Sequence, residues 1–210
     1  MSDASYKALL NEYRYLAGRY DDHWAGYTEA TVGQTVAQLP VLKDQRILDV
    51  GCGTGSLLIT LQGLAPALQL TGIDPSSEML DIAERKLCGQ ALLQHGYAEK
   101  LPFADASFDT LLSTNVFHFV HSPVTALAEF HRVLRPGGNL IITDWCNDYL
   151  VSRLRGRFSR FFRSNFHRIY GSRELSGLLS STGFSALHVE RYRFGVTWGL
   201  MTVSAACPAG

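Results

Sequence analysis

The sequence ILDVGCGTGS, at residues 47–56, joins a short apolar run to three alternate glycines. The apolar run has the length and composition of a buried strand, and a helical pattern begins at residue 54. Glycine lets the backbone turn tightly and lets a ligand approach without meeting a Cβ atom, and the N–H groups of the next helix face that ligand. The stretch therefore predicts a strand, turn and helix that bind a nucleotide-like molecule. A tight turn without a ligand has the same composition.

Short apolar runs and helical patterns alternate on both sides of this stretch. The apolar runs are 47–50, 68–73, 91–94, 108–113 and 139–143, and helical patterns begin at 54, 76 and 122. Such alternation is typical of crossover units on a parallel sheet with helices on both faces. Two last runs, 184–194 and 196–205, meet near Gly195 and predict an antiparallel pair at the sheet edge. We therefore expect an α/β fold with a doubly wound, mostly parallel, seven-stranded Rossmann-like sheet and an antiparallel last strand.

Composition limits the class of protein. The chain has 210 residues, 46% hydrophobic and 18% charged, which suits a single core. Its apolar runs are far shorter than the roughly 20 residues that cross a bilayer, and its start lacks the pattern of a secretory signal. The four cysteines, at 52, 88, 146 and 207, have neither metal-ligand spacing nor a disulfide framework. We expect a cytoplasmic protein with reduced thiols and no metal site.

A second acidic position follows the glycine stretch. The run 68–73 ends at Asp74, which lies nineteen residues after Gly55. This is close to the roughly twenty-residue offset at which a carboxylate meets ribose hydroxyls, although Asp74 can also cap the helix that begins at Ser76. Nicotinamide dinucleotides and S-adenosylmethionine both fit these features. A dinucleotide fingerprint has glycines at its first, third and sixth places, whereas Ser56 occupies the sixth place here.

Four ordered blocks separate the two ligand classes. They are LDVGCGTG at 48–55, GIDPSSEML at 72–80, AEKLPF at 98–103 with SFD at 107–109, and RVLRPGG at 132–138. Together they cover about residues 46–145 and resemble the class I S-adenosylmethionine-dependent methyltransferases, most closely the ubiquinone/menaquinone-biosynthesis-like subgroup (methyltransferase type 11). The resemblance implies S-adenosylmethionine as the cofactor and S-adenosylhomocysteine as its product.

The resemblance also implies roles at the methionine and ribose end of the cofactor. Asp49 would hold the methionine ammonium group. The backbone of Gly51, Cys52 and Gly53 would line the methionyl and ribose region. Asp74 would accept hydrogen bonds from the ribose hydroxyls.

At the adenine end, Pro75 and Met79 would pack near the ring, and the Ala98 backbone and Glu99 would border its polar edge. The subgroup usually has an acidic residue where this chain has Tyr97. The hydrogen bond to the adenine amino group therefore has two candidates: Glu99 can replace that acid, or the Tyr97 ring can stack on the base.

At the methyl end, the resemblance implies that Asn115, Val116 and Phe117 close the pocket beneath the sulfonium. The sequence YDDHWAGY, at residues 20–27, resembles the lid segment of the subgroup, with Tyr20 closest to the cofactor. Packing of Tyr20 and Trp24 in the core is the alternative.

A general base is optional for this chemistry. The sulfonium is already a strong electrophile, so alignment of an acceptor in a dry pocket supplies most of the catalysis, about 7–11 kcal/mol for well-oriented reactants. A base is needed only if the acceptor must lose a proton. His118, after the fourth strand, is the candidate catalytic residue, and a packed or solvated histidine is the alternative.

The charges are divided unevenly along the chain. Residues 149–173 contain seven arginines and no acid, and the run from Arg153 to Arg163 also carries aromatic side chains. The resemblance places acceptor-recognition insertions here. The run can be the solvated face of a cap helix, hold an anionic or lipid-like acceptor, or rest on an anionic membrane surface. Nucleic acid is disfavoured because the chain is neutral overall and shows no RNA-binding module.

These observations predict an enzyme that transfers a methyl group from S-adenosylmethionine to a small-molecule acceptor, anionic or apolar. A catalytically silent S-adenosylmethionine-binding protein and a nicotinamide-dependent oxidoreductase are the alternatives. We expect one domain over residues 1–210, with a helical lid at 1–40, a cofactor-binding core at 46–145, a cap and helix at 146–182, and a strand pair at 183–207. Within the lid, helical patterns predict one helix from Tyr6 to Ala17 and a second that Thr28 can cap and that runs to Leu39. The acceptor, the methylated atom and the oligomeric state are left undefined by the sequence.

Overall fold

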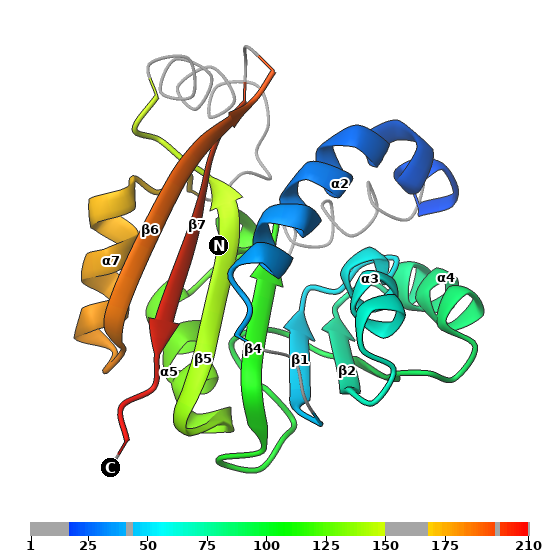
Figure 1. The fold of residues 1–210 in the computed structure, drawn as a ribbon, viewed down its shortest axis with the longest axis horizontal. Helices are drawn as coiled ribbons and strands as arrows, with labels where there is room; N and C mark the ends of the chain where they lie inside the picture. The colour runs from blue at the N-terminus through cyan, green and yellow to red at the C-terminus, as the bar shows by residue number, and fades with distance from the viewer. Residues whose placement is uncertain (1–16, 41–43, 150–167, 196–197, 210) are drawn as a thin grey trace.

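The fold is built on one seven-stranded sheet. A computed structural model describes residues 17–40, 44–149, 168–195 and 198–209, and its strand order is β3-β2-β1-β4-β5-β7-β6 (Figure 1). The first five strands in this order run parallel, and β7 runs antiparallel between β5 and β6. The predicted Rossmann-like sheet with an antiparallel last strand is confirmed. The strands are β1 (Arg46–Val50), β2 (Gln69–Asp74), β3 (Leu92–His95), β4 (Phe108–Thr114), β5 (Leu134–Trp145), β6 (Ser185–Phe194) and β7 (Trp198–Ala206).

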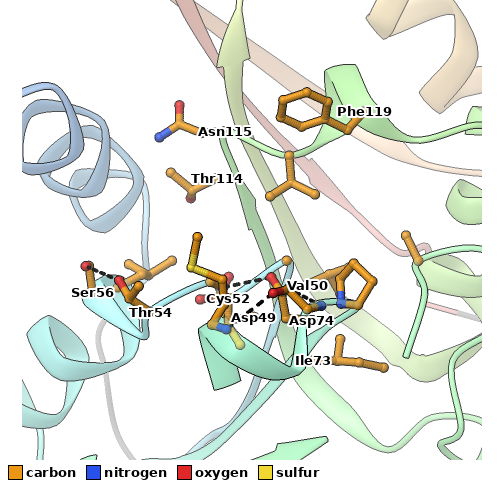
Figure 2. Close-up of a pocket in the computed structure, with 18 of the residues that line it drawn as sticks. Asp49, Val50, Cys52, Thr54, Ser56, Ile73, Asp74, Thr114, Asn115 and Phe119 are labelled. Atoms are coloured by element: carbon orange, nitrogen blue, oxygen red, sulfur yellow. Dashed lines mark hydrogen bonds between the residues drawn. The ribbon is translucent and has the colours of Figure 1, made fainter. Parts of the chain in front are cut away.

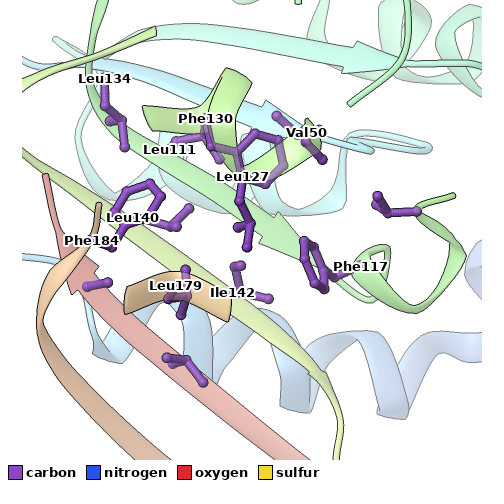
Figure 3. Close-up of a cluster of buried hydrophobic side chains, with 14 of the residues drawn as sticks. Val50, Leu111, Phe117, Leu127, Phe130, Leu134, Leu140, Ile142, Leu179 and Phe184 are labelled. Carbon is purple, nitrogen blue, oxygen red and sulfur yellow. The ribbon is translucent and has the colours of Figure 1, made fainter. Parts of the chain in front are cut away.

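Helices cover both faces of the sheet. Because successive strand residues point to opposite faces, Leu111 and Leu112 of β4 belong to different clusters. Leu111 packs in the cluster that contains α5 and α7 (Figure 3), whereas Leu112 packs in the cluster that contains α2, α3 and α4. No helix within the described residues has both the length and the apolar character needed to cross a membrane. The helices are α2 (Tyr20–Ala37), α3 (Ser56–Leu64), α4 (Ser77–Leu87), α5 (Pro123–Val133) and α7 (Ser172–Ser181), with the short 3-10 turns η1 (Ala17–Arg19) and η2 (Phe117–Phe119).

The order of the strands places a crevice between β1 and β4. Strands β2 and β3 follow β1 in the sequence and lie along one edge of β1. The chain then returns past β1, and β4 pairs with its other edge. Ligands of open α/β sheets bind at such a switch point, beyond the carboxyl ends of the strands. The glycine stretch follows β1 directly, so it lies at this crevice.

Two predicted boundaries are wrong. Helix α2 begins at Tyr20, not at Thr28, which lies inside it and caps nothing. The segment before Thr28 is helical because its acids stand in the first turn and its aromatic rings pack on the strand pair β6 and β7. Strand β5 begins at Leu134, not at residue 139, because Gly137 and Gly138 exchange backbone hydrogen bonds with Cys207.

Some predicted segments fall outside the described residues. These are residues 6–16 of the first predicted helix and residues 150–167 of the cap, which include the basic run from Arg153 to Arg163.

Buried hydroxyl groups fasten α2 to the sheet. The Thr35 hydroxyl lies 2.7 Å from that of Thr143 in β5 and 3.0 Å from that of Thr114 in β4. The Thr143 hydroxyl in turn lies 3.0 Å from the hydroxyl of Thr202 in β7, so the hydrogen bonds form a continuous series. Buried hydroxyl groups must be paired, so these contacts fix the position of α2 across the strand ends.

We predict that Thr35→Val lowers the free energy of unfolding by about 1–3 kcal/mol, because the shape is kept while buried hydroxyls lose a partner. Urea unfolding measures the change. Thr60→Val is the matched control, since the Thr60 hydroxyl is exposed and bonds only to a carbonyl in its own helix. Equal stabilities of the two variants would show that the buried chain does not hold α2.

Candidate functional site

A cavity opens at the crevice, and five segments form its wall. They are the glycine loop after β1, the end of β2, the segment after β3, the segment from β4 into η2, and one side of α2. Figure 2 shows Asp49, Cys52 and Asp74 gathered on one side of it, with Asn115 and Phe119 across from them. All twelve residues predicted to bind the cofactor line this cavity: Tyr20, Asp49, Gly51, Cys52, Gly53, Asp74, Pro75, Met79, Ala98, Glu99, Asn115 and Val116.

The glycine loop is held against β2 by its backbone. The N–H groups of Gly51 and Cys52 both donate to the carbonyl of Ile73, at 2.7 and 3.1 Å. Gly51 has a φ of 77°, and a Cβ atom there would lie 2.3 Å from a methyl group of Val116. Only glycine fits this turn, because any side chain would be strained and would displace the opposite wall.

Asp74 connects the glycine loop to the start of α4. Its carboxylate accepts hydrogen bonds from the N–H of Gly53, at 2.9 Å, and from the N–H of Ser76, at 2.8 Å. The residue that caps α4 is Ser76, whose hydroxyl accepts from the N–H of Met79. Asp74 therefore organises two loops at the cavity floor and does not itself cap the helix.

The two acids of the cavity are buried without a basic partner in its wall. Asp49 is 2% exposed and Asp74 is 8% exposed, and no lysine or arginine is among the described residues that line the cavity. Burial, followed by the charge of Asp74, raises the pKa of Asp49 to about 8. Burial raises the pKa of Asp74 to about 6, although the N–H groups of Ser76 and Gly53 lower it. A positively charged ligand would lower both pKa values and so favour the ionised carboxylates, with the larger change at Asp49.

Two side chains border the end of the cavity near β3. An oxygen of Glu99 accepts hydrogen bonds from the backbone N–H groups of His121 and Ser122, at 2.8 and 3.2 Å. Glu99 thus holds the start of α5 while it lines the cavity. Tyr97 is 41% exposed, and its ring meets that of His95 edge-on.

At the opposite end, α2 holds Asn115 in a strained backbone conformation. Asn115 has a φ of 62°, and its side-chain oxygen accepts a hydrogen bond from the Tyr27 hydroxyl at 2.7 Å. Its amide donates to the hydroxyl of Thr31 at 2.8 Å. The indole of Trp145 donates in turn to the Tyr27 hydroxyl, at 2.7 Å. Both polar atoms of the Asn115 side chain are therefore engaged by α2.

Phe117, predicted to close the pocket, packs in the hydrophobic core instead of lining the cavity, and His118 does not line the cavity either. His118 is 3% exposed, its Nδ1 lies 2.6 Å from Asp144, and its ring stacks on Trp145 at 4.2 Å. Its neighbours Phe119 and Val120 do reach the cavity wall. His118, the candidate base, therefore lies behind the cavity wall. It is packed there, as expected for the alternative that His118 is a packed histidine.

Sequence reasoning missed several residues that shape this site. Tyr27 and Thr31 were missed because the helix start was placed at Thr28, which hid the register of α2. Asp144 and Trp145 stand at the carboxyl end of β5, and their position at a strand end was the signal that could have found them.

We predict that the protein without cofactor loses stability as the pH rises from about 4 to 8, through Asp49. The folded pKa, about 8, exceeds the unfolded value near 4, so the folded state binds more protons across that window. The stabilising effect is complete below pH 4 and is lost as the pH approaches 8. Asp49→Asn should flatten this dependence, which thermal unfolding at pH 5 to 8 measures. Asp22→Asn, at an exposed site, is the control, and equal slopes would contradict the burial effect.

The family model described as "Methyltransferase domain" matches residues 48–142. The chain is 32% identical over 188 residues to "O-methyltransferase cnsE" of Penicillium expansum, covering 84% of this chain and 67% of that protein. It is 33% identical over 147 residues to a "Demethylmenaquinone methyltransferase" of Deinococcus radiodurans, covering 69% of this chain and 57% of that protein.

Among solved structures, the chain shares its fold with a protein of Thermotoga maritima described as an S-adenosylmethionine-dependent methyltransferase and possible histamine N-methyltransferase. The TM-score is 0.77 at 22% identity, and the match covers 93% of this chain and 97% of that one.

Proposed function

This chain belongs to the S-adenosylmethionine-dependent methyltransferases, and we propose that it methylates an uncharged, apolar small molecule in the cavity between β1 and β4. The family transfers the methyl group of S-adenosylmethionine to a small-molecule acceptor, as the sequence predicted. This membership removes the nicotinamide oxidoreductase alternative. The cytoplasmic location stays a prediction.

The buried acid pair carries the assignment of the cofactor site. S-adenosylmethionine has a positively charged sulfonium and a methionine ammonium group. Asp49, buried with a raised pKa and no basic neighbour in the wall, suits that ammonium group. A Cβ atom built at Gly53 would meet nothing within 4 Å, so the backbone of the glycine loop faces open space there and a ligand can approach it closely.

Asp74 suits the ribose hydroxyls. Each of its oxygens accepts one backbone hydrogen bond, from Gly53 or from Ser76, and each retains capacity for one more. The adenine ring would then extend toward Pro75 and Met79, with the Ala98 backbone at its edge. Glu99 already holds the start of α5, so we propose that the partly exposed Tyr97 ring stacks on the adenine ring.

The wall opposite the acid pair, formed by α2 and the segment after β4, indicates the polarity of the acceptor. Thr28 and Val32 of α2 face the cavity together with Asn115, Val116 and Phe119, and none of these five side chains is charged. An apolar acceptor would lose little hydration there, whereas an anion would find no charge partner among them. The name of one curated relative states an O-methyltransferase and that of the other a demethylmenaquinone methyltransferase, so hydroxyl-bearing acceptors and demethylmenaquinone should both be screened.

Catalysis follows from position. When bound, S-adenosylmethionine supplies a methyl group on a sulfonium, which is a strong electrophile. Asn115, fixed by Tyr27 and Thr31, and Phe119 would orient the acceptor toward that methyl group and exclude water. We assign His118 a positioning role in place of that of a base, because it stacks on Trp145 and pairs with Asp144 behind the wall.

We predict that Asp74→Ala raises the Kd for S-adenosylmethionine at least tenfold, because each hydrogen bond to a charged group contributes about 1.5–3 kcal/mol. Calorimetric titration measures the change. Asp81→Ala, at an exposed position of α4, is the control for the loss of one acid. Asp74→Asn keeps an oxygen for the backbone contacts, so it separates lost binding from a disordered loop. An unchanged Kd in both Asp74 variants would contradict the ribose contact.

A further inference from the structure

Asp21 connects the first turn of α2 to two other elements. One of its oxygens accepts a hydrogen bond from the Thr54 hydroxyl in the glycine loop, at 2.6 Å. The other lies 2.8 Å from the ammonium group of Lys86 in α4. Thr54 is only 2% exposed, whereas the Asp21 side chain is 43% exposed. A single exposed carboxylate thus joins α2 to the loop and the helix that border the cavity.

The first turn of α2 has no side-chain cap of its own. Its N-cap residue, Arg19, has a side chain that makes no capping hydrogen bond. The later turns of α2 are fastened to the sheet independently, through Tyr27 and Thr35. Because a helix end without a side-chain cap frays more readily, the contacts of Asp21 help to hold the first turn in place.

The residue that this turn presents to the cavity is Tyr20. It directly precedes Asp21, and it lines the cavity close to Asp74. Burial and the nearby charges of Asp74 and Asp21 raise the pKa of Tyr20 to about 12, so its hydroxyl keeps its proton at neutral pH. The Tyr20 side chain therefore stands over the ribose end of the cofactor site proposed above.

We infer that Asp21 is a positioning residue for the cofactor: by binding Thr54 and Lys86 it holds Tyr20 over the cavity and slows release of bound S-adenosylmethionine. This inference rests on the proposed function. Neither Asp21 nor Lys86 lines the cavity, so their effect reaches the ligand through the position of α2. The Asp21 to Lys86 pair is partly exposed, so salt should weaken it.

The test compares release of S-adenosylmethionine from Asp21→Ala and from the wild-type chain. Preloaded protein is mixed with excess S-adenosylhomocysteine, and the dissociation rate is followed by tryptophan fluorescence, to which Trp24 of α2 contributes. We expect release to be roughly five- to tenfold faster in the variant. This is smaller than the full effect of losing a charge-assisted hydrogen bond, because Asp21 acts on the ligand only through Tyr20. Asp22→Ala is the matched control, because it removes an acid from the same turn at an exposed position.

A second variant separates positioning from stability. Lys86→Met removes only the ion pair and keeps the Thr54 contact, so it should speed release by a smaller factor than Asp21→Ala does. When Lys86→Met is added to Asp21→Ala, it should have no further effect on release. High salt should speed release from the wild-type chain but not from Asp21→Ala. Asp21→Ala also removes the partner of the buried Thr54 hydroxyl, so its thermal midpoint should be lower than that of Asp22→Ala, and release is compared well below both midpoints.

Wild-type release rates in both Asp21→Ala and Lys86→Met would overturn the positioning role alone. Failure of the wild-type chain to bind S-adenosylmethionine at all would overturn the proposed function, and the positioning role with it.

Discussion

Two carboxylates, Asp49 and Asp74, are buried at the carboxyl ends of adjacent parallel strands, and no basic side chain among the described residues shares their cavity. Keeping two such groups ionised is costly unless a cation comes close. The surrounding loops are built on this pair, since Asp74 takes the N–H groups of Gly53 and Ser76 and so fixes the glycine turn. A site of this kind is prepared for a ligand that brings its own positive charge, as S-adenosylmethionine does.

Helix α2 completes the site from the other side, mainly through polar contacts. Its last turns share hydroxyl hydrogen bonds with β4 and β5, its middle holds Asn115 through Tyr27, and its first turn reaches Thr54 through Asp21. Hydrogen bonds depend on geometry more strongly than apolar contacts do, so they fix the register of the helix along the strand ends. The acceptor wall and the cofactor wall are thereby set relative to one another by a single element.

The sheet and the grouping of the candidate site residues around one cavity were predictable because their signals are local. The strand before Gly51, the offset to Asp74 and the alternation of runs all lie within short stretches of sequence, and each predicted cofactor-binding residue lines one cavity. The network around Asn115 was not predictable. Its partner Tyr27 lies 88 residues away, and Trp145 lies 118 residues from Tyr27, so only the folded sheet brings them together. Hydrophobic periodicity carries no information on such pairs.

The most direct measurement of the central claim is calorimetric titration of S-adenosylmethionine at pH 7 in two buffers that differ in ionisation enthalpy. If the acid pair receives a cation, binding converts protonated Asp49, with its pKa of about 8, to the ionised form. The account then predicts the release of about one proton per bound cofactor, seen as a buffer-dependent binding enthalpy. Binding with no change in protonation, or no binding, would contradict it.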